Sequence, residues 1–292
     1  MNERRTGLLY IVLAALLWST GGIGIKAVDD PPLKVTFYRS VFAAITLFAI
    51  FGWRTSRPPL GGRTGRPPSR LAFAAAIISY GLCLTAFVIA TKWTTAANAI
   101  FLQYAGVVWV LLLSPLVVRE PMRSRDAITI AVALGGMALF FVGRFEARGM
   151  AGNAMALVSS VFFALLILSL RREHDAARAA VTWGNVFIAL ALLPFVANDL
   201  ALSMKSFLAL AFLGVFQIAF AYAAFVKGLK HVTATEASLT GMLEPVANPI
   251  WVALFLGERP SVYAIAGGAV VLTAIAWHTM KGEPATEMPA PD

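Results

Sequence analysis

The sequence predicts an all-α integral membrane protein with ten transmembrane helices, arranged as two inverted five-helix repeats, and with both termini in the cytoplasm. Three observations predict this fold: the apolar composition, the number of apolar runs and a weak internal repeat. The chain has 292 residues, of which 59% are hydrophobic and 13% charged, and its mean hydropathy is +0.76. Soluble domains carry about 25% charged residues, so this composition indicates a membrane protein.

Ten apolar runs approach the length of about 20 residues that spans the hydrocarbon core as a helix. The loops between them are short, so no extramembrane domain is expected. The first run lacks a clear small-residue cleavage pattern, and we interpret it as a span and not as a signal peptide. The ten runs are residues 7–27, 33–52, 70–91, 95–118, 125–143, 150–170, 180–197, 204–227, 232–256 and 260–281.

The distribution of basic residues favours a cytoplasmic N-terminus. In that orientation sixteen of the 24 lysines and arginines lie on the cytoplasmic side, where such residues concentrate. An even number of spans returns the chain to its starting side. The net charge of +9 is then explained by orientation, and no nucleic-acid partner is expected. The basic loop from Arg54 to Arg70 is predicted to be a solvated cytoplasmic loop, with anionic-lipid contact as the alternative.

Self-comparison indicates a repeat. Residues 92–120 align without a gap to residues 230–258, an offset of 138, and seven of the 29 aligned positions are identical. A second match, at an offset of 145, pairs Gly7, Trp18 and Lys26 with Gly152, Phe163 and Arg171. Five spans per half force the second copy into the membrane upside down, as in many secondary transporters. The predicted units are a cytoplasmic N-terminus (1–6), two repeats (7–146 and 147–281) and a disordered cytoplasmic tail (282–292).

In chain order, the first three runs contain a few notable residues. Gly21, Gly22 and Gly24 in the first run allow close packing of helices. Arg39, in the second run, is predicted either to anchor the helix at the outer interface or to contact substrate. The third run contains Cys83, the single cysteine of the chain, which excludes an intrachain disulfide and is interpreted as inert packing.

The ninth run is interrupted by a carboxylate and two prolines. A carboxylate at mid-depth is costly unless it faces a partner or a wet cavity, so Glu244 is predicted to face inward. Pro245 and Pro249 cannot donate to the carbonyl four residues earlier. We therefore predict a hinge at Gly241, Pro245 and Pro249, and expect the first, fourth, sixth and ninth runs to pivot at mid-depth. Asn248 follows Glu244 by one turn on the same stripe.

These features resemble the ten-helix, EamA-type exporters of the drug/metabolite transporter superfamily. The resemblance rests on Trp18 and Ser19 in the first run, Arg39 in the second, and the segment LEPVANPIWVALFLGERP in the ninth, and it covers residues 7–281. It implies a bacterial inner-membrane exporter of small metabolites, above all amino acids. The aromatic-rich interior makes the aromatic and neutral amino-acid exporters the branch that the chain resembles most.

Two departures limit what the resemblance implies. The first half has Val107 where family members often repeat the proline that corresponds to Pro245, so the halves are not expected to line a cavity equivalently. The small four-helix drug exporters of the superfamily use a carboxylate in the first helix, but Leu8 to Val28 contains none. Their proton-for-drug mechanism is therefore not carried over.

We predict a substrate site inside the bundle, formed by aromatic side chains and a few polar groups, as small-molecule sites usually are. Such a lining suits an amphipathic zwitterion, with Glu244 at the ammonium and Arg39, amides or a helix N-terminus at the carboxylate. A proton-coupling role and a structural role for Glu244 are left open. The predicted substrate-binding residues are Trp18, Arg39, Tyr80, Phe101, Gln103, Tyr104, Phe163, Trp183, Gln217, Tyr222, Glu244 and Asn248.

Other function classes fit the sequence less well. His174, His231 and His278 have no spacing that suits a metal site, and no catalytic constellation or phosphate-binding loop is found. The chain is therefore predicted not to be an enzyme and to use no cofactor or metal. The inverted repeat favours alternating access over a channel, and exporters of drug-like cations or sugar nucleotides are the other alternative. The expected partners are a small-molecule substrate and membrane lipid, and the protein is expected to be a monomer.

Overall fold

The structure, a computed structural model, describes residues 3–55, 70–139, 142, 149–256 and 262–281. These residues form fourteen α-helices and one π-helical segment, and the described part contains no strand. Seven helices are long and apolar enough to cross a membrane, so the chain is a multi-pass membrane protein. They are Glu3–Lys26, Pro32–Trp53, Arg70–Trp93, Ala96–Val117, Met150–Arg172, Ala177–Val196 and Met204–Leu229.

Several of the apolar runs consist of two or three helical elements in series. The fifth, ninth and tenth runs correspond to α7, to α12 with α13, and to α14, which are not among the seven membrane-length helices. Ten spans therefore stay a prediction. The elements are α1 (Glu3–Trp18), α2 (Gly21–Lys26), α3 (Pro32–Thr55), α4 (Arg70–Trp93), α5 (Ala96–Gln103), α6 (Gly106–Val117), α7 (Ser124–Leu139), α8 (Met150–Arg172), α9 (Ala177–Val196), α10 (Met204–Phe212), η1 (Leu213–Phe220), α11 (Ala221–Leu229), α12 (Ala234–Gly241), α13 (Leu243–Leu256) and α14 (Val262–Lys281).

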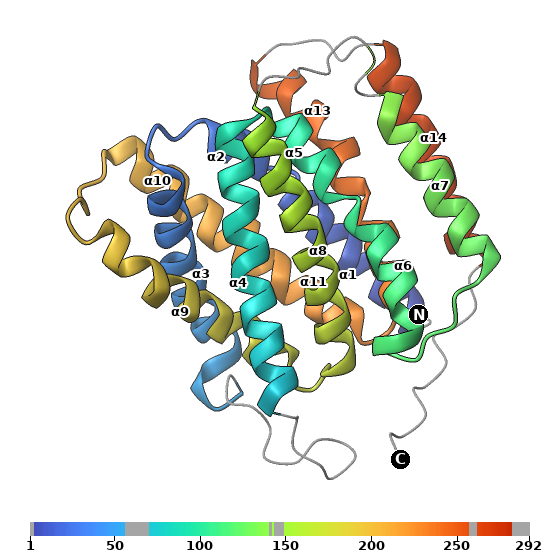
Figure 1. Cartoon of the computed structure of the whole chain (residues 1–292), viewed down its shortest axis with the longest axis horizontal. Coiled ribbons are helices and arrows are strands. Elements are labelled where there is room, and N and C mark those ends of the chain that lie inside the picture. Colours follow the sequence, from blue (N-terminus) through green and yellow to red (C-terminus); the bar gives the residue numbers. More distant parts are fainter. Residues whose placement is uncertain (1–2, 56–69, 140–141, 143–148, 257–261, 282–292) are drawn as a thin grey trace.

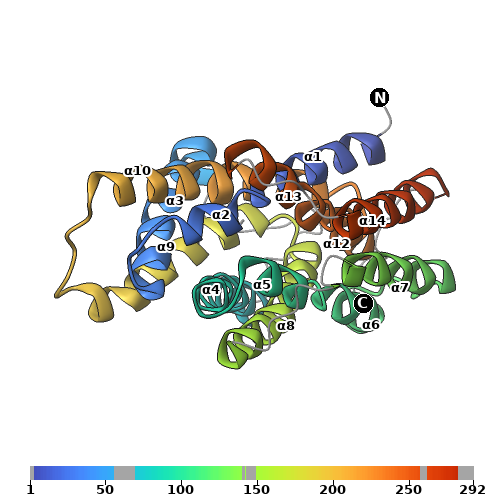
Figure 2. The same ribbon diagram turned by 90° about the horizontal axis from the view of Figure 1, so that it is seen from above.

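Helices from the two halves of the chain pack side by side. α4 pairs with α8, α3 with α9, α1 with α11, and α7 with α14. Figures 1 and 2 place the α7–α14 pair at one end of the molecule and α9 and α10 at the other. Both hydrophobic clusters of the core draw residues from both halves. Neither half therefore packs around a core of its own.

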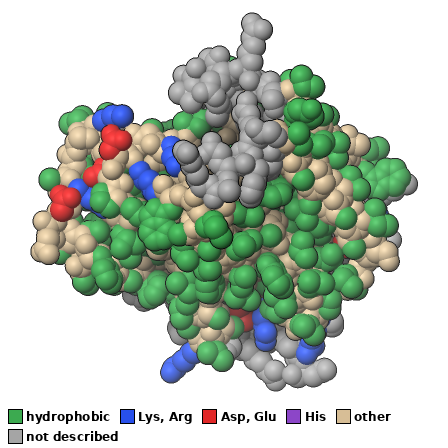
Figure 3. Space-filling view, turned by 45° about the horizontal axis from the view of Figure 1, so that its top comes forward, with side chains coloured by type: hydrophobic (Ala, Val, Ile, Leu, Met, Phe, Trp, Pro, Cys, Tyr) green, Lys and Arg blue, Asp and Glu red, His purple; other side chains and the backbone are tan. Residues whose placement is uncertain are grey.

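The surface is dominated by apolar side chains. Figure 3 shows them across the middle of one face, whereas charged side chains lie toward its upper left and its bottom. Large apolar residues such as Leu116, Leu190 and Phe195 are 65–79% exposed. In water such a surface would be an aggregation liability, but against lipid tails it is well matched.

Two apolar runs are broken at matching positions. α5 ends at Gln103, and α12 ends 138 residues later at Gly241. Both begin after a threonine, Thr95 or Thr233, whose side-chain oxygen accepts a hydrogen bond from the backbone N–H three residues later. This N-cap satisfies a donor at the start of each helix. Pro245 accounts for the second break, whereas the first break has no proline beside it.

Glycines allow matching close approaches in the two halves. A Cβ on Gly7 would lie 2.7 Å from His231 Cβ and 3.1 Å from Val232 Cγ1. A Cβ on Gly152 would lie 2.6 Å from the Thr94 backbone N and 2.7 Å from the Trp93 carbonyl carbon. The two contacts are equivalent in the internal repeat. Gly7 and Gly152 are 145 residues apart, and the segments that they contact, 93–94 and 231–232, are 138 residues apart. At Gly152 the two nearest atoms are backbone, so they cannot move aside by changing a rotamer.

We expect Gly152→Ala to destabilise the protein by about 1–3 kcal/mol, the usual cost of overpacking, because α8 must move away from the end of α4. Gly135→Ala is the matched control, since a Cβ at this helical glycine of α7 meets no atom within 4 Å. Alanine there should leave stability unchanged or raise it slightly. Thermal melting of both variants in detergent checks this, and equal melting temperatures would contradict the proposed contact.

Candidate functional site

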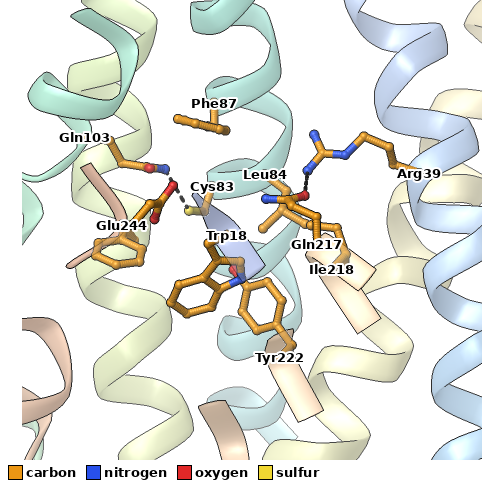
Figure 4. A pocket seen from close by; sticks show the side chains of 11 residues that line it. Trp18, Arg39, Cys83, Leu84, Phe87, Gln103, Gln217, Ile218, Tyr222 and Glu244 are labelled. Carbon is orange, nitrogen blue, oxygen red and sulfur yellow. Dashed lines mark hydrogen bonds between the residues drawn. The ribbon is translucent and has the colours of Figure 1, made fainter. Parts of the chain in front are cut away.

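A small cavity of about 40 Å³ lies inside the bundle. Figure 4 shows Arg39 and Gln217 on one side of it, Glu244 and Gln103 on the other, and the rings of Trp18 and Tyr222 between them. The helices that supply these side chains come from both halves of the chain. The lining residues are Trp18, Arg39, Cys83, Leu84, Phe87, Gln103, Phe163, Gln217, Ile218, Tyr222 and Glu244.

Arg39 is a buried cation. Its side chain is 3% exposed, and its Nη2 donates a 2.6 Å hydrogen bond to Gln217 Oε1. Its Nε has no hydrogen-bond partner, and no carboxylate among the described residues pairs with the guanidinium. A buried charge of this kind is costly unless it is compensated. The structure therefore leaves this cation without its counter-charge at the wall of a cavity.

Gln217 lies in the π-helical segment η1. A π-helical turn inserts one extra residue per turn and is often found at functional sites. Here it places the Gln217 amide toward Arg39 while Ile218, the next residue, also lines the cavity. Gly21 permits this arrangement, since a Cβ there would lie 2.7 Å from Gln217 Nε2.

On the other side of the cavity Glu244 contacts Tyr104. The Tyr104 hydroxyl lies 2.9 Å from Glu244 Oε2 and 2.5 Å from the carbonyl oxygen of Gly241. Glu244 is 6% exposed and Tyr104 is 1% exposed. No cation among the described residues forms an ion pair with Glu244.

A polar wall connects α4, α5 and α8 beside Glu244. Gln103 Nε2 donates to Ser159 Oγ at 2.7 Å, and Ser159 Oγ donates to the Cys83 carbonyl at 3.0 Å. The Cys83 thiol lies 3.8 Å from both side chains. These bonds hold the Gln103 amide at the cavity wall, because every group involved is buried and needs a partner.

Aromatic rings form the rest of the lining. The Trp18 ring lies 5.1 Å from that of Tyr222, and Tyr222 lies 4.8 Å from Tyr80, both in edge-to-face geometry. Asn185 donates a 2.7 Å hydrogen bond to the Tyr80 hydroxyl from behind. Edge-to-face packing fixes the ring orientations, so the cavity has rigid apolar faces between two polar ends.

The structure brings seven of the twelve predicted substrate-binding residues to the cavity. The other five lie elsewhere: Tyr80 and Tyr104 form a second layer behind Tyr222 and Glu244, and Phe101 is partly buried among other core residues. Trp183 packs against Phe48 and Trp53, each at 5.8 Å. Asn248 donates to the Ser19 carbonyl, where α1 gives way to α2. The seven are Trp18, Arg39, Gln103, Phe163, Gln217, Tyr222 and Glu244.

Sequence reasoning did not assign Cys83, Leu84, Phe87 or Ile218 to the site. A partial signal was present, because Cys83 and Phe87 share one helical face with Tyr80 in the third run. The thiol that the sequence suggested to be inert packing is a lining residue. Ile218 follows Gln217 directly, and both lie in the π-helical segment η1 and line the cavity.

Two of the three predicted hinge residues, Gly241 and Pro245, lie at the second helix break, and Pro249 lies further along α13. Gly241 is the last residue of α12, and Pro245 and Pro249 lie in α13. The first run is also broken, between α1 and α2, whereas α8, the sixth run, is continuous. The hinge stays a prediction, and comparison of the exchange rate of Pro245→Ala with that of the wild-type protein tests it.

Buried ion pairs join helix ends at the start of α12. Arg171 Nε donates to Glu120 Oε1 at 2.8 Å, and Glu120 Oε2 accepts from the Ala234 backbone N–H at 2.8 Å. Arg4 forms a further pair with Glu236 at 2.6 Å. These contacts tie the ends of α8 and α1 to the start of α12.

A second ionic network joins the start of α3 to the segment between α9 and α10. Lys34 Nζ lies 3.1 Å from Asp30 and 3.0 Å from Asp199. Burial raises the pKa of Asp30, but hydrogen bonds from Ser206 and Lys34 outweigh it and hold that pKa below the ordinary value. Lys26 donates to the Thr94 carbonyl at 2.7 Å nearby. Asp30 therefore stays ionised within this network.

The cavity is too small to hold a metabolite as it stands. A volume of about 40 Å³ holds about two or three water molecules. Small-molecule sites are usually several hundred Å³. Entry of any metabolite therefore requires the lining helices to separate.

Comparison with known proteins gives a family match. A model of the EamA-like transporter family matches residues 5–142 and again residues 150–280. An uncharacterized transporter of Archaeoglobus fulgidus is 24% identical over 288 residues, which cover 94% of this chain and 97% of the relative. An uncharacterized protein of Pseudomonas aeruginosa is 28% identical over 94% of this chain and 96% of its own length.

A solved structure has the same fold. A chain titled "Crystal structure of protein" superimposes with a TM-score of 0.79 over 94% of this chain and 97% of its own length, at 17% identity. At that identity the likeness concerns the fold alone.

Proposed function

The chain belongs to the EamA-like transporter family, and on this premise we propose that it exports aromatic and neutral amino acids by alternating access. The observation that carries the substrate class is the unpaired Arg39 guanidinium facing a cavity that has Glu244 at its other side. A zwitterion supplies the counter-charge that Arg39 lacks through its carboxylate, and offers an ammonium to Glu244. Its side chain packs against the rings of Trp18 and Tyr222.

The proposed architecture is ten spans in two inverted repeats. The family model matches the two halves separately. The breaks after α5 and α12, their threonine caps, and the contacts of Gly7 and Gly152 recur at the offsets of the internal repeat. Arg4 Nη1 donates to the Thr279 carbonyl, which places the start of α1 beside the end of α14. This favours an even number of spans, and the excess of basic residues favours both termini in the cytoplasm of a bacterial inner membrane.

Alternating access requires that the two closing networks open in turn. In the proposed orientation the Arg171–Glu120 pair closes the cytoplasmic side and the Lys34–Asp30–Asp199 cluster closes the outer side. Helices broken at mid-depth, such as α5–α6 and α12–α13, are the elements that pivot in transporters of this plan. The breaks at Gln103 and Gly241 adjoin the proposed site, so movement there changes the lining directly.

Transport of labelled phenylalanine into proteoliposomes of purified protein tests the proposed function. We expect saturable uptake that is accelerated by unlabelled phenylalanine on the opposite side, because a carrier exchanges substrate. Unsaturable flux would indicate a channel. If phenylalanine, leucine and tryptophan do not move while a lipophilic cation or a sugar nucleotide does, the amino-acid proposal is wrong and the exporter alternatives stand.

A further inference from the structure

The hydroxyl of Tyr104 faces two oxygen atoms at hydrogen-bond distance. One is the Gly241 carbonyl at 2.5 Å and the other is Glu244 Oε2 at 2.9 Å. A tyrosine hydroxyl carries a single proton, which serves one of them well. The hydrogen of the other contact has to come from elsewhere.

The hydroxyl proton belongs with the Gly241 carbonyl. In a continuous helix that carbonyl would accept from the N–H four residues later, but residue 245 is proline and has no N–H. Tyr104 replaces this missing donor at the break between α12 and α13. A buried carbonyl without a donor is costly, and the shorter of the two distances is the one to Gly241.

If the hydroxyl proton lies on the Gly241 carbonyl, the hydrogen of the second contact has to come from Glu244. An ionised carboxylate would place its charge 2.9 Å from an oxygen that has already donated its proton, in a site 6% exposed. A neutral carboxyl instead donates from Oε2 to the Tyr104 hydroxyl, which completes a chain from Glu244 through Tyr104 to Gly241. Hydrogen bonds in such chains strengthen one another.

The groups around Glu244 agree with this assignment. Tyr104 at the end of α5, Cys83 on α4 and Tyr222 on α11 are uncharged at neutral pH, and Arg39 on α3 lies on the far side of the cavity. On α12 Glu236 pairs with Arg4, and on α14 His278 bonds Asp126. α1 contributes Trp18 and Ser19, which do not titrate. In the described residues, therefore, no adjacent cation stabilises a carboxylate at this position.

We propose that Glu244 is a proton-binding site, loaded in the empty transporter, and that the substrate ammonium displaces this proton. This inference rests on the proposed function. On binding, the Oε2–H bond breaks and the proton leaves through cavity water to the bulk. The resulting carboxylate accepts an N–H of the ammonium, and Tyr104 keeps its proton on the Gly241 carbonyl. Substrate and proton therefore compete for one carboxyl group, which couples amino-acid export to proton entry.

Proton release on binding tests the exchange. Full-length protein in weakly buffered detergent solution at neutral pH is mixed with saturating phenylalanine, and a pH indicator reports the protons set free. We expect about one proton per bound phenylalanine in the wild-type protein and in Arg172→Gln, a control at an exposed arginine outside the cavity. Glu244→Gln should release none. 3-Phenylpropionate, which lacks the amino group, should bind without release. Phenylalanine binding to wild-type protein without proton release overturns the exchange.

Infrared spectroscopy of the empty protein tests the loaded carboxyl without any substrate. We expect the C=O band of a protonated carboxyl at neutral pH, absent from Glu244→Gln and shifted in Tyr104→Phe, where the hydrogen-bond acceptor is lost. If wild-type protein lacks this band, the proton site is wrong even if phenylalanine is transported. If the band is present and phenylalanine does not bind, the proton site stands and the amino-acid proposal falls. If Glu244→Gln does not fold, the shift of the band in Tyr104→Phe still tests whether the band belongs to Glu244.

Discussion

Replacing Arg39 by glutamine should weaken phenylalanine binding about 30-fold or more and at the same time make the empty protein more stable. The guanidinium is buried, and its Nε has no partner, so in the empty state it costs free energy that glutamine does not. Glutamine keeps an N–H donor for Gln217. In the complex, loss of a buried partner of the substrate carboxylate costs about 2–5 kcal/mol, roughly a 30-fold to several-thousand-fold rise in Kd.

Equilibrium binding and thermal melting of the same samples measure the two effects. Arg172→Gln is the matched control, because this arginine is 57% exposed at the end of α8 and its loss should change neither quantity. Arg39→Lys keeps the positive charge but loses the planar guanidinium with its paired N–H donors, so it should bind phenylalanine with intermediate affinity. A less stable Arg39→Gln protein with unchanged affinity would indicate that Arg39 is a structural residue and not part of the substrate site.

Much of the helical framework can be predicted from the sequence, because a bilayer limits which backbone structures can span it. Apolar runs correspond to helices, and the described residues contain no strand, since only helices or closed barrels satisfy the backbone inside a bilayer. Pro245 also indicates the break between α12 and α13. The break after α5 has no such local cause, since the chain there reads QYAGVVW without proline. It is visible only through the repeat, which aligns it with the proline-containing copy.

Part of the candidate site is predictable from the sequence, because placing a charged side chain against lipid costs free energy. A charged side chain inside a membrane has to face a cavity or a partner, and this reasoning predicts an inward Glu244, whereas for Arg39 it leaves interface anchoring and substrate contact as alternatives. The same reasoning fails for single aromatic residues. Trp183 lies in an apolar run as Trp18 does, yet it packs on Phe48 and Trp53 whereas Trp18 lines the cavity. Which face of a helix meets the cavity depends on helices far away in the sequence.

Other features of the site depend on geometry that has no sequence signature. The π-helical turn of η1 changes the register of Gln217 and Ile218 by a fraction of a turn, and no proline or glycine pair marks it. Tyr104 looks like a lining residue in sequence but acts behind Glu244, as the donor to a carbonyl that Pro245 leaves unpaired. The pattern LEPVANPIWVALFLGERP ends in residues 257–260, which lie outside the described residues.

Replacing Arg171 by alanine should destabilise the protein by about 3–5 kcal/mol, the usual cost of breaking a buried ion pair by removing one partner. Arg171 and Glu120 are 6% and 11% exposed, and Arg171 Nη1 also donates to the Leu229 carbonyl at 3.1 Å. The variant leaves both the carboxylate and the carbonyl without that donor. The double variant with Glu120→Ala should recover part of this loss, because no uncompensated charge remains. Thermal melting measures both, and additive losses would contradict the pairing.

The same variant should open the cavity on one side only, and the chain carries its own reporter of this opening. Cys83 is the single cysteine, it is buried, and it lines the cavity. In vesicles, a membrane-impermeant thiol reagent should modify Cys83 faster in Arg171→Ala than in the wild-type protein when it is added on the side of Arg171.

Lys34→Ala is the mirror control, because it breaks the Asp30–Lys34–Asp199 cluster at the other end and should expose Cys83 to reagent added on the opposite side. Because each variant weakens one network and leaves the other intact, alternating access requires opposite sidedness. Equal modification from both sides in either variant would indicate loosening of the whole bundle and would contradict the assignment of these two networks as separate gates.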